Sequence, residues 1–187
     1  MNDTFPRTIE NCLGEKLTFL ALQKEPYGDR LWVENYVTPG NGPLMHTHLL
    51  QDESLTVVKG LLAYQILGRP KQYAQEGETV LFRRGTPHRF WNAGQEALQC
   101  KGWIKPANTI VFFLSSIYAA QNKSGSARPE AFDAAYLMTR YASEYDMAEM
   151  PKFVKKIVVP VTYFIGNLLG KYTHFKDAPA PVTQKKA

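Results

Sequence analysis

The first two-thirds of the chain consists of short runs of branched and aromatic residues, each bounded by Gly, Pro or Asn. Runs of this kind are typical of β-strands. Gly60 interrupts the third run, which predicts a tight bend or bulge between two strands. Many short strands with closely spaced turns predict a sandwich or a closed barrel. The predicted strand runs are Leu17–Leu22, Arg30–Thr38, Glu53–Leu67 and Thr79–Phe82.

After Pro106 the apolar positions change to helical spacing. Residues 108–120 and 130–141 each place apolar side chains on one face, and the polar stretch 121–129 between them predicts a loop. We therefore expect three parts in the chain: a β-barrel domain at residues 1–106, a helical appendage at residues 107–176 that packs on the barrel or on a partner, and a loose Pro-, Ala- and Lys-rich tail at residues 177–187.

A third apolar segment runs from Phe153 to Leu169, and Pro160 is expected to kink or divide it. It is too short to cross a membrane, which takes about 20 apolar residues. Two interpretations stay open: the helix packs on the barrel or a partner subunit, or it lies on an anionic membrane surface, since lysines flank it. Its apolar stripe is Val154, Ile157, Val158, Val161, Ile165 and Leu168, and the flanking lysines are Lys155, Lys156 and Lys171.

The net charge of +5 over 187 residues is unevenly distributed. Residues 151–187 carry seven lysines against one aspartate, a net charge of +6, so residues 1–150 carry −1. Because the barrel is nearly neutral and the predicted helices 108–141 carry few basic residues, the sequence predicts no nucleic-acid partner. The two cysteines, Cys12 and Cys100, are too few for a disulfide framework, and residues 1–17 lack an apolar run of signal-peptide length. These features predict a cytoplasmic protein.

Three of the four histidines lie in two short segments with a pattern typical of metal ligands. His46 and His48 are separated by one residue, so on a strand both imidazoles point to the same side. A short turn then brings Glu53, and a second turn at Gly85 precedes His88. Three imidazoles and one carboxylate are suitable ligands for one divalent ion of Fe, Mn, Ni or Zn.

The spacing of these residues resembles the two motifs of the cupins. The first motif, G-x5-H-x-H-x4-E-x6-G, is matched at every fixed position by Gly40, His46, His48, Glu53 and Gly60. The second, G-x5-P-x-G-x2-H-x3-N, is matched by Gly77, Gly85, His88 and Asn92. Arg83 stands where the family usually has proline, which affects a turn and no ligand; Arg83 and Arg84 are interpreted as solvent-exposed turn residues, with an anionic-substrate site as the alternative.

The resemblance implies a single-domain protein that is mainly β, a cupin jelly-roll β-barrel (double-stranded β-helix) followed by C-terminal α-helices. It assigns His46, His48, Glu53 and His88 as ligands of one divalent metal ion in the mouth of the barrel. It also implies a homodimer that covers exposed sheet edges. Cupins with this ligand set include dioxygenases and oxalate-converting enzymes.

Apolar residues that share a face with the ligands are candidates for lining a ligand pocket; the alternative is that they are ordinary barrel core. The first functional hypothesis is therefore a metal-dependent, dioxygenase-like enzyme acting on a small, partly apolar molecule. The second is a non-catalytic small-molecule-binding or sensor cupin. The candidate pocket residues are Leu55, Val57, Leu62, Tyr64 and Phe90.

Overall fold

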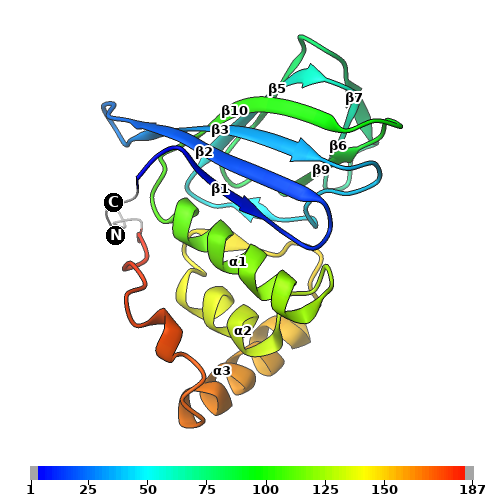
Figure 1. Cartoon of the computed structure of the whole chain (residues 1–187). Coiled ribbons are helices and arrows are strands. Elements are labelled where there is room, and N and C mark those ends of the chain that lie inside the picture. Colours follow the sequence, from blue (N-terminus) through cyan, green and yellow to red (C-terminus); the bar gives the residue numbers. More distant parts are fainter. Residues whose placement is uncertain (1–3, 184–187) are drawn as a thin grey trace.

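The computed structural model describes residues 4–183, in which antiparallel β-sheets are followed by helices (Figure 1). The larger sheet has six strands in the order β1-β2-β3-β10-β5-β8, and the smaller has three in the order β7-β6-β9. Sequence-adjacent strands are often not neighbours in these sheets, as in a jelly roll. The strands of the large sheet are β1 (Arg7–Glu10), β2 (Glu15–Gln23), β3 (Arg30–Val37), β5 (Asp52–Lys59), β8 (Thr79–Phe82) and β10 (Leu98–Lys105).

The small sheet is formed by β6 (Leu62–Ile66), β7 (Gln72–Ala74) and β9 (His88–Asn92), and its buried residues form one cluster with buried residues of the large sheet. All four predicted strand runs are confirmed. The bend at Gly60 is also confirmed: β5 ends at Lys59, β6 begins at Leu62, and Gly60 has a φ of +96°, which favours glycine. This bend takes the chain from β5 in the large sheet to β6 in the small sheet.

Helices complete the core over the other half of the large sheet. The inward side of β3 alternates as expected of a half-buried strand, and it contacts two different partners along its length. Leu31 and Val33 belong to a cluster with Ile110, Tyr118 and Leu137 of the helices. Further along the same strand, Val37 packs with the small sheet instead. The helices therefore serve as the missing part of the second layer rather than as an addition to a finished barrel.

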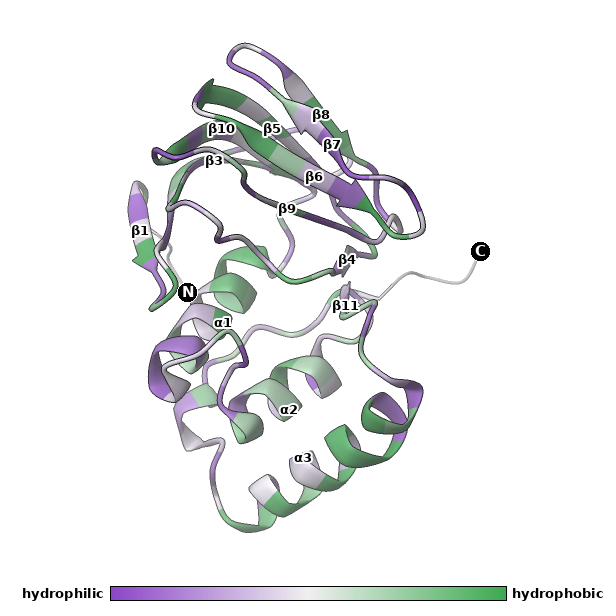
Figure 2. Ribbon diagram, turned by 90° about the vertical axis from the view of Figure 1, so that its right-hand side faces the viewer, coloured by the Kyte–Doolittle hydropathy of each residue, from purple (hydrophilic) through white to green (hydrophobic). Residues whose placement is uncertain are grey.

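The helices follow β10 in three successive layers below the strands (Figure 2). The predicted segments 108–120 and 130–141 correspond to the first two helices, with small differences at the ends. The third apolar segment forms a π-helical turn that continues into an α-helix, and Pro160 lies directly after the change from π-helix to α-helix at Val159. The helical elements are α1 (Ile110–Ser124), α2 (Ala131–Arg140), the π-helix η1 (Val154–Val158), α3 (Val159–Leu168) and the 3-10 helix η2 (Thr173–Phe175).

The apolar stripe predicted for the third segment does not form its packed face. Ile157, Val158, Val161, Ile165 and Leu168 are all exposed, and only Val154 is half-buried. The segment packs instead through Tyr163 and Gly166, because their side has aromatic partners on α2 and on the chain after α3. Among residues 4–183, no helix combines the length and apolar character needed to cross a membrane.

The described part of the predicted tail, residues 177–183, has no regular secondary structure but is attached to the helices. The Tyr141 hydroxyl donates to the Pro179 carbonyl at 2.8 Å, and the Ser143 hydroxyl donates to the Val182 carbonyl at 2.8 Å. The rest of the predicted tail, residues 184–187, lies outside the described residues.

Candidate metal centre

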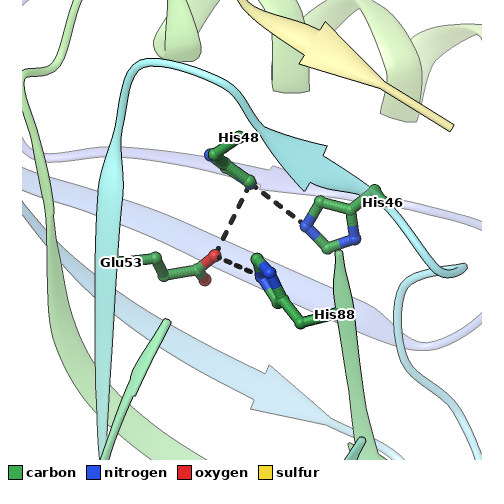
Figure 3. Close-up of side chains that lie close together, drawn as sticks. All are labelled: His46, His48, Glu53 and His88. Carbon is green, nitrogen blue, oxygen red and sulfur yellow. Dashed lines mark hydrogen bonds and ion pairs between the residues drawn. The ribbon is translucent and has the colours of Figure 1, made fainter. Parts of the chain in front are cut away.

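Three segments bring the predicted metal ligands together. His46 directly precedes the short strand β4 (Thr47–His48), His48 ends it, Glu53 lies on β5, and His88 opens β9 (Figure 3). The backbones of His46 and His88 form a β-bridge, with His46 N donating to His88 O at 2.9 Å and His88 N to His46 O at 2.8 Å. This bridge joins the two motifs. His88, Phe90 and Asn92 are all buried on one side of β9.

Backbone carbonyls fix the orientation of two of the imidazoles. His46 Nδ1 lies 2.7 Å from Leu44 O, and His88 Nδ1 lies 2.8 Å from Thr86 O. Because a carbonyl oxygen can only accept, both Nδ1 atoms must carry the proton. When His46 and His88 are neutral, each presents an Nε2 lone pair to the centre of the cluster, whereas a doubly protonated His88 would donate from Nε2 to Glu53 Oε2, 3.3 Å away. A second hydrogen bond of this kind is typical of histidines that bind metal ions.

The donor atoms converge as a metal site requires. His46 Nε2 is 3.1 Å from His48 Nε2, and Glu53 Oε2 is 3.5 Å from His48 Nε2 and 3.3 Å from His88 Nε2. One donor atom from each of the four residues lies within 4.8 Å of all the others. Lone pairs of imidazole and carboxylate that face one another at such distances repel unless a proton or a cation lies between them. The residues thus fit a single divalent cation.

The electrostatics of the site favour the protonation states that bind metal. Burial, with the neighbouring imidazoles, lowers the pKa of His46 to about 3, and burial lowers that of His48 to about 4. Burial alone would raise the pKa of Glu53, but the hydrogen bond with His88 and the nearby imidazoles outweigh it and hold the pKa at about 2. At neutral pH the two histidines are therefore neutral and the glutamate is ionised, as metal ligands must be.

Residues other than the fixed positions of the two motifs hold the ligands in place. The Phe82 ring stacks on His88 with ring centroids 4.0 Å apart and an angle of 7° between the planes. The helical appendage contributes the strand β11 (Tyr145–Asp146), which pairs with β4 so that Tyr145 lies opposite His48. The Tyr145 ring is edge-on to the His48 imidazole at 5.7 Å. The pairing of β11 with the histidine strand was not predicted, because nothing in the residue types around Tyr145 indicates it.

A buried glutamate joins the appendage to the histidine segment. The Glu144 side chain is fully buried and accepts hydrogen bonds from the Thr109 hydroxyl at 2.9 Å, Val182 N at 2.9 Å and Gln51 Nε2 at 3.0 Å. Its backbone carbonyl accepts from Leu49 N at 2.8 Å. Gln51 and Leu49 lie in the turn between His48 and Glu53, so this network fixes the loop that spaces two of the ligands.

The two arginines of the second motif pair with a carboxylate. Arg84 N donates to Asp52 Oδ1 at 2.8 Å, its Nε donates to the same oxygen at 3.2 Å, and Arg83 Nη1 lies 3.4 Å from Asp52 Oδ2. The arginine side chains are 69% and 53% exposed, which supports the interpretation as solvent-exposed turn residues. Asp52 thus holds the turn before His88 in a protein that lacks the usual proline.

The five candidate pocket residues lie in the packed interior of the barrel. Leu55, Val57, Leu62 and Phe90 are at most 4% exposed, and Tyr64 packs against the same cluster. Their arrangement matches the alternative of ordinary barrel core. That they line a ligand pocket stays a prediction.

Comparison with known proteins agrees with the motifs. Residues 35–104 match the family model described as a cupin domain, a span that contains all four candidate ligands. No curated protein sequence matches this chain.

Several solved structures are similar to part of this chain at low sequence identity. KdgF from Halomonas sp. is 18% identical, with a TM-score of 0.47, over 54% of this chain and 86% of that one. A conserved protein with a double-stranded β-helix domain from Klebsiella pneumoniae is 18% identical, with a TM-score of 0.42, over 57% and 84%. The cupin domain of Cnp3 from Schizosaccharomyces pombe is 16% identical, with a TM-score of 0.41, over 47% of this chain and 59% of that one, so the match spans less than two thirds of the Cnp3 chain.

Proposed function

The chain contains a cupin domain, and we propose that it is a metal-dependent, dioxygenase-like enzyme that acts on a small, partly apolar molecule. One divalent ion of Fe, Mn, Ni or Zn would be bound by His46, His48, Glu53 and His88. The observation that carries the proposal is the convergence of these four donor groups within 4.8 Å, three of them on buried residues.

The bound ion would supply Lewis-acid polarisation of a substrate oxygen or, as iron, activation of dioxygen. The protein's own contribution is to keep the His46 and His48 imidazoles neutral and the Glu53 carboxylate ionised. Glu53, His48 and His88 are at most 7% exposed, whereas His46 is half-buried. We expect a substrate to approach from the side of His46. The apolar Phe82 ring, which stacks on His88, supports a partly apolar substrate.

The test is oxygen consumption by the iron-loaded protein with a panel of catechols, flavonols and diketones. An enzyme of the proposed kind consumes oxygen with at least one of them above the rate of the metal-free protein. The second function, a non-catalytic small-molecule-binding or sensor cupin, predicts tight binding of a panel member without turnover. If the iron-loaded protein binds a panel member but consumes no oxygen, the second function replaces the first.

Removal of the metal is expected to lower the thermal stability. A ligand that binds only the folded state at about 1,000 times its Kd stabilises by about 4 kcal/mol, which corresponds to roughly 10 °C in a chain of this size. The measurement is the melting temperature of zinc-loaded protein before and after dialysis against a chelator. Readdition of zinc should restore the higher value and magnesium should not, since imidazole donors favour transition metals. Equal melting temperatures in all samples would contradict metal binding at a folded site.

A further inference from the structure

The last helical segment leaves a continuous apolar face in solvent. We propose that this face binds the surface of an anionic lipid bilayer. The face lies on η1 and α3, at the end of the molecule away from the sheets, where Figure 2 shows α3 to be mostly hydrophobic. Its six residues are between 42% and 69% exposed. We call it the outer face, and it consists of Phe153, Ile157, Val161, Phe164, Ile165 and Leu168.

The opposite side of the same helix is firmly packed, so the outer face has a fixed orientation. Tyr163 stacks on Tyr172 at 5.3 Å and lies 6.2 Å from Tyr136 of α2. Gly166 is buried, and a Cβ at this position would overlap the Tyr172 hydroxyl, so only glycine allows this close approach. Rotation of the helix to bury the outer face against α2 would break these contacts. The face is therefore available to a partner outside the chain.

The positive charge of the lysines around the outer face favours an anionic partner. Residues 150–176 contain five lysines and no aspartate or glutamate. Lys152 and Lys156 are exposed and precede Phe153 and Ile157, and Lys171 is exposed just beyond the other end of α3. An apolar helical face bordered by lysines is typical of helices that lie in the interface of a bilayer, with the lysines among the headgroups of anionic lipids.

A second copy of the chain is a poorer partner for this face. A two-fold interface places the same surface on both sides, so the lysines at each end of one helix would approach those of the other. No acidic residue within 150–176 is present to compensate them. Insertion across the bilayer is also disfavoured, since no described helix has the length and apolar character to span it. Peripheral binding satisfies both the apolar and the charged groups.

The experiment is co-sedimentation of the full chain with vesicles of phosphatidylcholine alone and with vesicles that contain 30 mol% phosphatidylserine. We expect binding to the anionic vesicles and at least tenfold weaker binding to the neutral ones. Raising the salt concentration should weaken the binding, because surface charges are screened. The metal content of the protein should not alter these results. The vesicle experiment therefore tests membrane binding independently of the proposed enzyme function.

Paired variants separate the contributions of apolar and charged groups. Phe164→Ser with Leu168→Ser is expected to lower the partition coefficient at least tenfold. Lys152→Gln with Lys156→Gln should lower it about 25-fold, at about fivefold per lysine. The matched controls are Val58→Ser with Leu81→Ser, which are 44% and 40% exposed on the barrel, and Lys16→Gln with Lys71→Gln. These controls should bind as the original protein does.

Three results would overturn the proposal. The first is no binding of the original protein to the anionic vesicles. The second is an equal loss in the barrel controls, which would show that binding is unspecific. The third is a dimer in solution that dissociates on the Phe164→Ser and Leu168→Ser substitutions, as measured by light scattering, because the outer face would then be an interface between two copies.

Discussion

Replacement of His88 by alanine is expected to lower the affinity for a divalent transition metal by at least about 100-fold, since loss of residues that merely orient metal ligands already costs 10- to 100-fold. His88 is fixed by the Thr86 carbonyl at 2.8 Å and by the stacked Phe82 ring, and its Nε2 lies 3.3 Å from Glu53 Oε2. Its removal takes away one of four donors and leaves His48, at 3.5 Å, as the imidazole beside the Glu53 carboxylate. The measurement is a zinc titration by calorimetry.

The matched control is His174→Ala, which removes the histidine outside the cluster. His174 is 48% exposed and lies 3.1 Å from Asp133, so its loss should leave the metal affinity unchanged. Glu53→Gln serves as a second test that keeps the volume of the side chain and removes only its charge, and it should also weaken binding strongly. Affinity that is unchanged in both His88→Ala and Glu53→Gln would show that the metal does not bind here.

The second large effect is expected at Glu144. Glu144→Ala should lower the free energy of unfolding by about 3 kcal/mol, because it removes the buried carboxylate that accepts from the Thr109 hydroxyl, the Gln51 amide and Val182 N. Only the Tyr145 hydroxyl would remain as a partner for the first two donors. The same change should weaken metal binding by about 10- to 100-fold, since Glu144 supports the turn between His48 and Glu53. Urea denaturation and the zinc titration measure the two effects.

The control for this prediction is Glu149→Ala, an exposed acid close in sequence, which should change stability by less than about 0.5 kcal/mol. Glu144→Gln should be intermediate, because it keeps one acceptor oxygen and turns the other into a donor that faces donors. If Glu144→Ala were as stable as the control, the network would not hold the appendage to the barrel. If stability fell and metal affinity did not, the network would be structural only.

The sequence predicted the β-region and the convergence of the ligands because both depend on local periodicity. Alternation along β9 decides which side His88 takes, and the H-x-H spacing does the same for His46 and His48. The second motif also ends on Asn92, whose amide nitrogen donates to Val37 O at 2.8 Å and to Glu96 O at 2.7 Å. That residue therefore fixes the end of β9 and needs no role at the metal.

The contributions of the appendage could not be predicted, because they depend on contacts between residues far apart in the chain. Glu144 is separated by 93 positions from its partner Gln51, and β11 has only two residues. A periodic pattern does not specify a partner at that distance. Likewise, the spacing of Ile157, Val161 and Leu168 predicted an apolar face on the last helix. It did not predict that this face is exposed to solvent, because that depends on the packing of Tyr163 and Gly166 on the opposite side.

The central claim is that His46, His48, Glu53 and His88 bind one divalent metal ion. Its most direct test is elemental analysis of protein without a His tag, loaded in turn with iron, manganese, nickel and zinc and then freed of excess metal. The account predicts one equivalent of at least one of these metals per chain in the original protein and in His174→Ala, and less than a tenth of that in His88→Ala, on the scale of a ligand loss. An original protein that retains none of the four metals would contradict it.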